Sequence, residues 1–80
     1  MDKKVTVYST PTCPFCMMAK KFLNENNIGF EDIDVSSDQT KAREMVQKSG
    51  QMAVPVLDID GEVIVGFDKE RIKKALGLPL

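Results

Sequence analysis

The sequence contains two cysteines, and they lie three residues apart in the segment Cys13-Pro14-Phe15-Cys16. If a helix begins at this segment, residues i and i+3 share one face at a separation that disulfide geometry tolerates. The pair can then alternate between a dithiol and a disulfide without a large movement of the backbone. The spacing therefore predicts a reversible redox centre.

Thiol exchange requires a thiolate, and the position of the first cysteine favours one. Cys13 precedes Pro14 at the predicted opening of a helix, where unpaired N–H groups and the positive end of the helix dipole stabilise a negative sulfur. Cys16 lies inside the first turn, so we expect it to be less exposed and more often protonated. We therefore predict that Cys13 is the attacking nucleophile and Cys16 the resolving thiol, with Pro14 and Phe15 tuning the reduction potential.

Other interpretations of the two cysteines stay open. One alternative is that both cysteines are inert thiols of the core. The motif Cys-Pro-aromatic-Cys between a strand and a helix favours reactive thiols instead. No resident metal is expected, because zinc ordinarily takes four ligands and the chain has no histidine and no second Cys-x-x-Cys. An iron-sulfur cluster shared between two chains, or a non-catalytic binding module, is a further alternative. Met17, Met18 and Met45 suggest a soft-metal surface, but their helical spacing favours positions in or near the core for most of them.

The composition predicts one small soluble domain that spans residues 1–80. The chain has a net charge of -1, with 42% hydrophobic and 29% charged residues. Basic residues are interleaved with acids, which is typical of solvated helix faces and argues against nucleic acid. No signal peptide and no run of membrane-spanning length is seen, so we expect a cytoplasmic protein. There the thiol pool keeps a Cys-x-x-Cys pair reducible, which favours exchange chemistry over a structural disulfide.

The elements around the cysteines form a predicted strand, helix and strand. Residues 5–8 are β-branched and aromatic, which is typical of a strand, and residues 9–12, including Pro11 and Thr12, follow as a loop. From Pro14 the pattern takes a helical period with an apolar stripe of Met18, Ala19, Phe22 and Leu23. Residues 30–35 alternate between apolar and acidic, which indicates a second strand with one wet face. A helix between the two strands predicts that they run parallel.

The second half of the chain predicts a helix, a hairpin and a last helix. Ser36 as N-cap and Gln39 form a capping box for a helix that ends at Gly50. Residues 54–59 and 62–65 form a hairpin around Asp60-Gly61, the preferred pair for a type I′ turn. The inner faces of the two helices are predicted to carry Ala42, Met45 and Val46, then Ile72, Ala75 and Leu76. Asp68 caps the last helix, and Gly77 and Pro79 close it.

The resulting order is βαβαββα, an α/β fold with a four-stranded mixed sheet flanked by three helices. Four aspartates lie in or beside the predicted strands: Asp32, Asp34, Asp58 and Asp60. Because apolar and polar residues alternate in these strands, we expect the aspartates to lie on a solvated face and not to form paired catalytic carboxylates. No Asp or Glu lies next to the thiols in the sequence.

Three segments together resemble the glutaredoxins, within the thioredoxin fold. They are residues 8–16, which carry the cysteines, residues 49–55, which precede the third strand, and residues 60–68, which run from the hairpin to the last helix. The resemblance covers nearly the whole chain. It implies a thioredoxin-like domain that performs thiol-disulfide oxidoreduction on protein disulfides or glutathione mixed disulfides, as a monomer with no bound cofactor and with glutathione as co-substrate.

The resemblance also implies a substrate-binding surface. Val54-Pro55 is expected to be a cis peptide beside the disulfide, with the backbone of Val54 pairing with glutathione or a peptide. The γ-glutamyl carboxylate of glutathione is expected at the start of the last helix, at Gly66, Phe67 and Asp68. A plain trans proline at Pro55 and a helix cap at Asp68 are the alternatives for these residues.

The chain departs from the family pattern at three positions. Many glutaredoxins have Gly-Gly where this chain has Gly66-Phe67, a basic residue where it has Thr10, and a threonine where it has Ala53. Gly-Phe is similar to glutaredoxin-like redoxins that supply electrons to ribonucleotide reductase and are recharged by thioredoxin reductase. Those two proteins are therefore alternative partners to glutathione.

Overall fold

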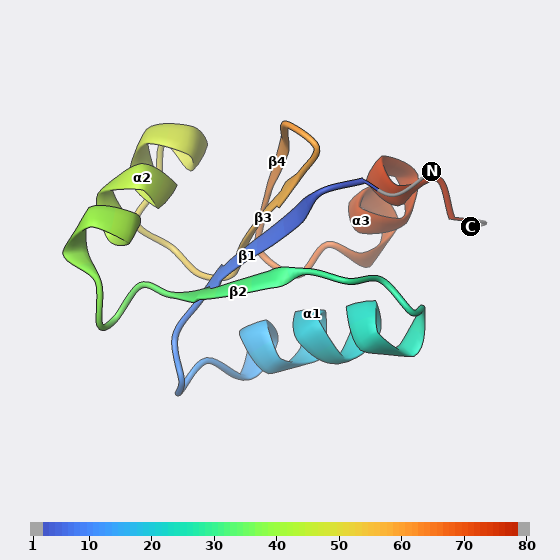
Figure 1. Ribbon diagram of the computed structural model, residues 1–80, viewed down its shortest axis with the longest axis horizontal. Helices are drawn as coiled ribbons and strands as arrows, with labels where there is room; N and C mark the ends of the chain where they lie inside the picture. The colour runs from blue at the N-terminus through green and yellow to red at the C-terminus, as the bar shows by residue number, and fades with distance from the viewer. Residues whose placement is uncertain (1–2, 79–80) are drawn as a thin grey trace.

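Within residues 3–78, which the computed structural model describes, the chain forms four strands and three helices (Figure 1). In chain order they are β1 (Val5–Ser9), α1 (Pro14–Glu25), β2 (Glu31–Asp34), α2 (Gln39–Ser49), β3 (Val56–Ile59), β4 (Glu62–Val65) and α3 (Lys69–Leu76). This is the predicted order βαβαββα, so the predicted α/β fold is confirmed. No helix in this part of the chain combines the length and the apolar character needed to cross a membrane.

The four strands form one mixed sheet in the order β2-β1-β3-β4. β1 runs parallel to β2 and antiparallel to β3, and β3 runs antiparallel to β4. Tyr8 near the end of β1 lies opposite Val56 at the start of β3. The loop that follows β1 and the segment that precedes β3 therefore leave the sheet at the same end.

Each face of the sheet has its own apolar cluster, because side chains alternate along a strand. The larger cluster joins the sheet to α1 and α3 and contains Val5, Val7, Ala19, Phe22, Leu23, Leu57, Ile59, Ile64, Ile72 and Ala75. The smaller cluster lies under α2 and is built on Tyr8, Met45 and Val56. In Figure 1, α2 accordingly stands apart from α1 and α3. The redox segment belongs to the α1 side of the sheet.

The predicted cap of α2 and the predicted burial of methionines on α1 were wrong. Asp38, not Ser36, caps α2, since its Oδ1 accepts the N–H of Lys41 at 3.1 Å. Ser36 instead donates its backbone N–H and its hydroxyl to Asp34 Oδ1, at 2.9 and 2.6 Å, in a turn that ends β2. The second error concerns Met18, which is 48% exposed. Met18 is only about 40° from Phe22 around the helix axis, but it lies outside the narrow stripe of α1 that is buried against the sheet.

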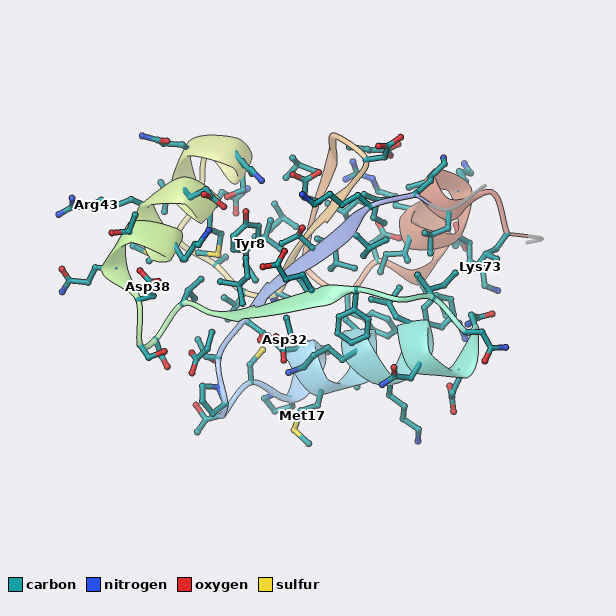
Figure 2. All side chains as sticks on the ribbon, viewed as in Figure 1. Tyr8, Met17, Asp32, Asp38, Arg43 and Lys73 are labelled. Carbon is teal, nitrogen blue, oxygen red and sulfur yellow. The ribbon has the colours of Figure 1, made fainter. Side chains whose placement is uncertain are left out.

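Most of the three methionines Met17, Met18 and Met45 were expected in or near the core, but Met17 is also exposed, at 62%. Figure 2 shows its side chain directed away from α1. Met45, by contrast, is buried under α2 as predicted. The buried residues of α1 are Cys16, Ala19, Phe22 and Leu23.

The remaining turns and caps follow the sequence. Asp60 and Gly61 have φ of 52° and 96°, the positive values that a type I′ turn needs, and they join β3 to β4. Gly50 and Gly77 end α2 and α3 in the left-handed conformation. Asp68 caps α3 as predicted, while Pro79 lies outside the described residues.

Candidate active site

Cys13 is the N-cap residue of α1. Its backbone is extended, with φ of -102° and ψ of 109°, and its Sγ accepts the backbone N–H of Cys16 at 3.1 Å. Pro14 takes the first helical position, where the absence of an N–H costs nothing. The sulfur therefore occupies the place that an oxygen usually takes at a helix start, where partial positive charge favours an anion.

Cys16 lies in the first turn of α1 and is completely buried. Burial raises the pKa of its thiol to about 11, and the hydrogen bond with Cys13 acts in the same direction. A backbone hydrogen bond at Thr10 and the charge of Lys20 act in the opposite direction. Both cysteines are free thiols, so the structure is that of the dithiol form. The protein thus holds one half-exposed sulfur beside one buried, protonated sulfur.

The loop around the cysteines is open to solvent. Pro11, Thr12 and Pro14 are exposed, and Phe15 is 60% exposed. The N–H of Cys13 donates to the carbonyl of Thr10 at 3.4 Å, which closes the turn before α1. A substrate disulfide can therefore approach Cys13, whereas the helix covers Cys16.

The segment before β3 lies at the same end of the sheet. The Val54-Pro55 peptide bond is cis, as the family resemblance implied, and Pro55 is buried while Val54 is half-buried. A pocket of ≈ 240 Å³ opens between this segment and the loop after β1. Its lining residues are Thr10, Val35, Ser36, Ala42, Met45, Met52, Ala53 and Val54. Thr10 comes from the loop that leads to Cys13, but neither cysteine lines this pocket, which lies on the α2 side of that loop.

The three residues expected to bind the γ-glutamyl carboxylate have different surroundings. Gly66 donates its N–H to the carbonyl of Pro55 at 2.8 Å, so it lies directly beside the cis proline. Phe67 is half-buried and packs edge-on against Phe22, with ring centroids 6.2 Å apart. Asp68 is exposed, and its Oδ1 accepts the N–H of Arg71 at 3.2 Å. Asp68 thus has the capping role that the sequence left as its alternative.

Sequence reasoning missed an ion pair on the α1 face. Lys20 Nζ lies 2.9 Å from Asp32 Oδ2, and the hydroxyl of the buried Ser9 donates to Asp32 Oδ1 at 2.7 Å. Figure 2 shows Asp32 above the start of α1. Asp32 is exposed, as expected for a solvated face, and it also joins β1 and β2 to α1. No local pattern connects residues this far apart in the sequence.

A second charged network lies on the other face, between α2 and the sheet. The fully buried Tyr8 donates its hydroxyl to Glu44 and accepts a hydrogen bond from Lys48 at 2.9 Å. Lys48 also pairs with Asp58 at 2.8 Å. Burial raises the pKa of Tyr8, and the hydrogen bond to Glu44 adds to the rise. Asp58 is only partly exposed, so the expectation of a simply solvated carboxylate was wrong for it.

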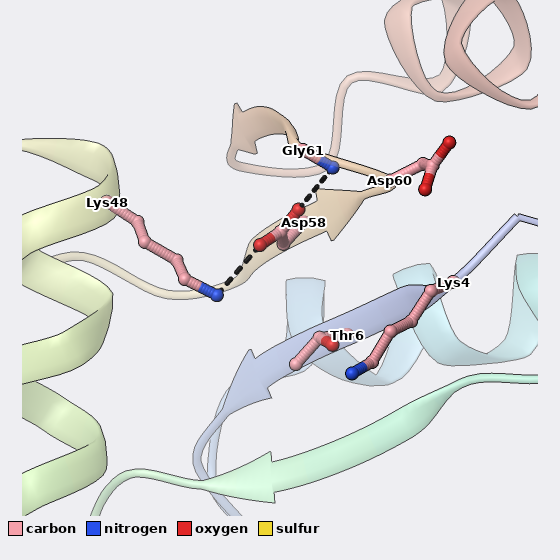
Figure 3. Close-up of a pocket in the computed structure, with 6 residues that line it drawn as sticks. All are labelled: Lys4, Thr6, Lys48, Asp58, Asp60 and Gly61. Atoms are coloured by element: carbon pink, nitrogen blue, oxygen red, sulfur yellow. Dashed lines mark hydrogen bonds and ion pairs between the residues drawn. The ribbon is translucent and has the colours of Figure 1, made fainter.

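A small polar pocket adjoins this network (Figure 3). Its volume is ≈ 180 Å³, and it is lined by Lys4, Thr6, Lys48, Asp58, Asp60 and Gly61. It lies toward the start of β1, whereas Cys13 follows the end of that strand. Its charges are of both signs, so it offers no net attraction to an anion or a cation. Within residues 3–78, no group of three or more Cys, Asp or Glu side chains is arranged to hold a metal ion.

Comparison with known proteins assigns the family. Residues 5–64 match the family model Glutaredoxin. The chain belongs to the glutaredoxin family. A glutaredoxin-like 8.6 kDa protein of the rubredoxin operon of Clostridium pasteurianum is 46% identical over 72 residues, which cover 90% of this chain and 96% of that protein. Glutaredoxin 3 of Escherichia coli is 34% identical over 64 residues, which cover 80% of this chain and 77% of the relative.

A solved structure shows the same fold. A crystal structure of a thioredoxin-like protein superposes with a TM-score of 0.89 at 34% identity, covering 95% of this chain and 97% of that one. The fold is therefore thioredoxin-like, as the sequence predicted. Membership of the glutaredoxin family makes the chain a thiol oxidoreductase by class, with Cys13 and Cys16 as its candidate dithiol.

Proposed function

We propose that this protein is a disulfide oxidoreductase in which Cys13 attacks and Cys16 resolves. The observation that carries the proposal is the contrast between the two sulfurs. Cys13 is half-exposed and accepts an N–H at the start of α1, whereas Cys16 is buried with its pKa raised to about 11. A thiolate is the reactive species, so the exposed sulfur that a helix start stabilises is the nucleophile.

The reaction consists of two exchanges. The Cys13 thiolate attacks one sulfur of a substrate disulfide, which forms a mixed disulfide and releases the first thiolate. Cys16 then loses its proton and attacks Cys13 Sγ, so that the Cys13–Cys16 bond forms as the bond to the substrate breaks. Two electrons pass from the dithiol to the substrate. The protein ends as a disulfide that an external thiol must reduce.

Protein disulfides and glutathione mixed disulfides are the proposed substrates, with glutathione as co-substrate. The half-buried Val54 precedes the cis proline, and its backbone supplies the groups with which an extended peptide pairs. Gly66 lies beside Pro55, and α3 begins three residues later, at Lys69, where the backbone N–H groups of a helix start suit a carboxylate. We infer a monomer in the cytoplasm, with no bound cofactor.

A second candidate keeps the chemistry and changes the electron donor. Phe67 stands where many family members have a second glycine, and it packs against Phe22 instead of leaving open backbone. This favours a redoxin that is recharged by thioredoxin reductase and that passes electrons to an enzyme such as ribonucleotide reductase. An iron-sulfur-binding module remains a third candidate, and visible absorption bands in freshly purified protein would support it.

Two cysteine variants test the division of labour. We expect Cys13→Ser to abolish all exchange. Cys16→Ser should retain turnover of a glutathione mixed disulfide while losing the reduction of protein disulfides. The assays couple turnover either to glutathione and its reductase or to thioredoxin reductase, and the faster couple identifies the donor. Equal loss in both variants with every substrate would contradict the assigned roles.

A further inference from the structure

The ion pair on the α1 face lies beside the buried thiol. Lys20 follows Cys16 by one helical turn, so the two side chains share a face of α1. The Lys20 side chain is 25% exposed, and its ammonium group lies 2.9 Å from Asp32 on β2. Asp32 is in turn held by the hydroxyl of Ser9, which is 2% exposed. The charge of Lys20 is therefore held on the Cys16 side of α1, in an ion pair whose carboxylate side chain is 43% exposed.

The register of β1 against β2 explains why the Asp32 carboxylate lies on the α1 face of the sheet. Val7 lies opposite Asp32 in the parallel pair, and Val7 packs in the cluster under α1 and α3. Opposed residues of a sheet point to the same side, so Asp32 also faces α1. Asp34 is the other acid of β2 whose charge interacts with Lys20, but its Oδ1 is already bonded to Ser36.

The second exchange requires the Cys16 thiol to ionise, and the burial of Cys16 opposes this. Cys16 must attack as a thiolate, and its burial disfavours a negative charge. In the free dithiol, two of the causes that raise the pKa of Cys16 come from Cys13. Both causes are lost once Cys13 is bonded to a substrate sulfur. Burial is then opposed by the backbone hydrogen bond at Thr10 and by the positive charge of Lys20.

We propose that Lys20, held in place by Asp32, stabilises the Cys16 thiolate in the resolving exchange. The inference rests on the function proposed above. In this step the Cys16 thiol gives its proton to solvent, and the sulfur bonds to Cys13 Sγ. The substrate thiolate leaves with the electron pair of the broken bond and takes a proton from solvent.

The expected size of the effect follows from how thiolates react. Loss of a nearby positive charge lowers the fraction of Cys16 that is ionised at neutral pH. The remaining thiolate is more basic and therefore a better nucleophile, with a Brønsted coefficient of about 0.4–0.5. A loss of about tenfold in the thiolate fraction thus slows the exchange by about threefold.

The test uses Lys20→Gln, with Lys21→Gln as the matched control. Lys21 is the exposed neighbour on the same helix. Rapid mixing of the reduced protein with 5,5′-dithiobis(2-nitrobenzoate) releases one coloured thiol when Cys13 attacks and a second when Cys16 resolves. The first phase depends on reagent concentration and the second does not. We expect Lys20→Gln to slow the second phase by about threefold and to move its pH profile upward. We expect the first phase to be unchanged and Lys20→Arg to restore the second.

The outcomes separate this inference from the proposed function. Equal second phases in the Lys20→Gln and Lys21→Gln variants would overturn the role of Lys20, as would a slower phase whose pH profile has not moved. Absence of the first phase in the wild-type protein would instead overturn the function itself. Lys20→Met, which keeps most of the aliphatic stem, is the second neutral variant if the glutamine variant does not fold.

Discussion

The starts of α1 and α2 have the same capping geometry but different chemistry. Cys13 Sγ accepts the N–H three residues later at 3.1 Å, and Asp38 Oδ1 accepts the N–H three residues later, also at 3.1 Å. A carboxylate is ionised at neutral pH and makes the stronger cap, whereas a sulfur is a weak acceptor unless it is a thiolate. The comparison shows that α1 carries a reactive group at the position where α2 carries a purely stabilising one.

Replacing the N-cap residue of α1 should have the largest effect on activity. We expect Cys13→Asp to abolish disulfide exchange, because no nucleophile remains at the exposed position. The same change should leave the melting temperature unchanged or raise it, since Asp is among the preferred N-cap residues and also places an anion at the helix start. Exchange assays and thermal melts in parallel measure both effects, and a variant that melts below the wild type would break the comparison.

Alkaline pH should destabilise the reduced protein through Cys16. Burial raises the pKa of this thiol from 9.0 to about 11 in the folded state. Between these values the unfolded chain loses the proton that the folded chain retains. The contribution of Cys16 to stability is therefore complete below about pH 9 and is lost as the pH rises through about 11. Urea unfolding of the reduced protein against pH measures the slope, and Cys16→Ala should flatten it.

Removing the cap of α2 should affect stability alone. Asp38→Ala is expected to lower the free energy of unfolding by about 1 kcal/mol, because the N–H of Lys41 loses its partner. Disulfide exchange should be unchanged, since Asp38 is not part of the dithiol loop. Urea titration and the exchange assay together check this. A large loss of exchange would mean that α2 acts on the redox site.

Ser36→Ala should have the smallest effect. Ser36 bonds to Asp34 in an exposed turn and does not cap α2, so we expect a loss of at most about 0.5 kcal/mol. The measurement is the same urea titration. A loss as large as that of Asp38→Ala would show that the cap predicted from the sequence is the real one.

The parts of the fold that depend on residues close together in the sequence could be predicted. The hairpin needs only two positive φ values, which Asp60-Gly61 supplies, and the dithiol lies within four residues. The cap of α2 was misplaced because Ser36 and Asp38 both suit an N-cap, and only the bonds to Asp34 assign Ser36 to the turn.

Interactions across elements could not be predicted. The pairing of Lys20 with Asp32 depends on the register of β1 against β2 and on how α1 lies over them, and neither is encoded in a local pattern. The exposure of Met18 has the same origin, since the sheet contacts a narrower stripe of α1 than the apolar spacing indicates.

Selective alkylation tests the unequal reactivity of the two sulfurs most directly. The reduced native protein is treated with limiting iodoacetamide near neutral pH, and the labelled peptides are quantified by mass spectrometry. We predict label on Cys13 and none on Cys16 until the protein is unfolded, because the one sulfur is half-exposed at a helix start and the other is buried and protonated. Equal labelling of both thiols in the native protein, or faster labelling of Cys16, would contradict the assigned roles.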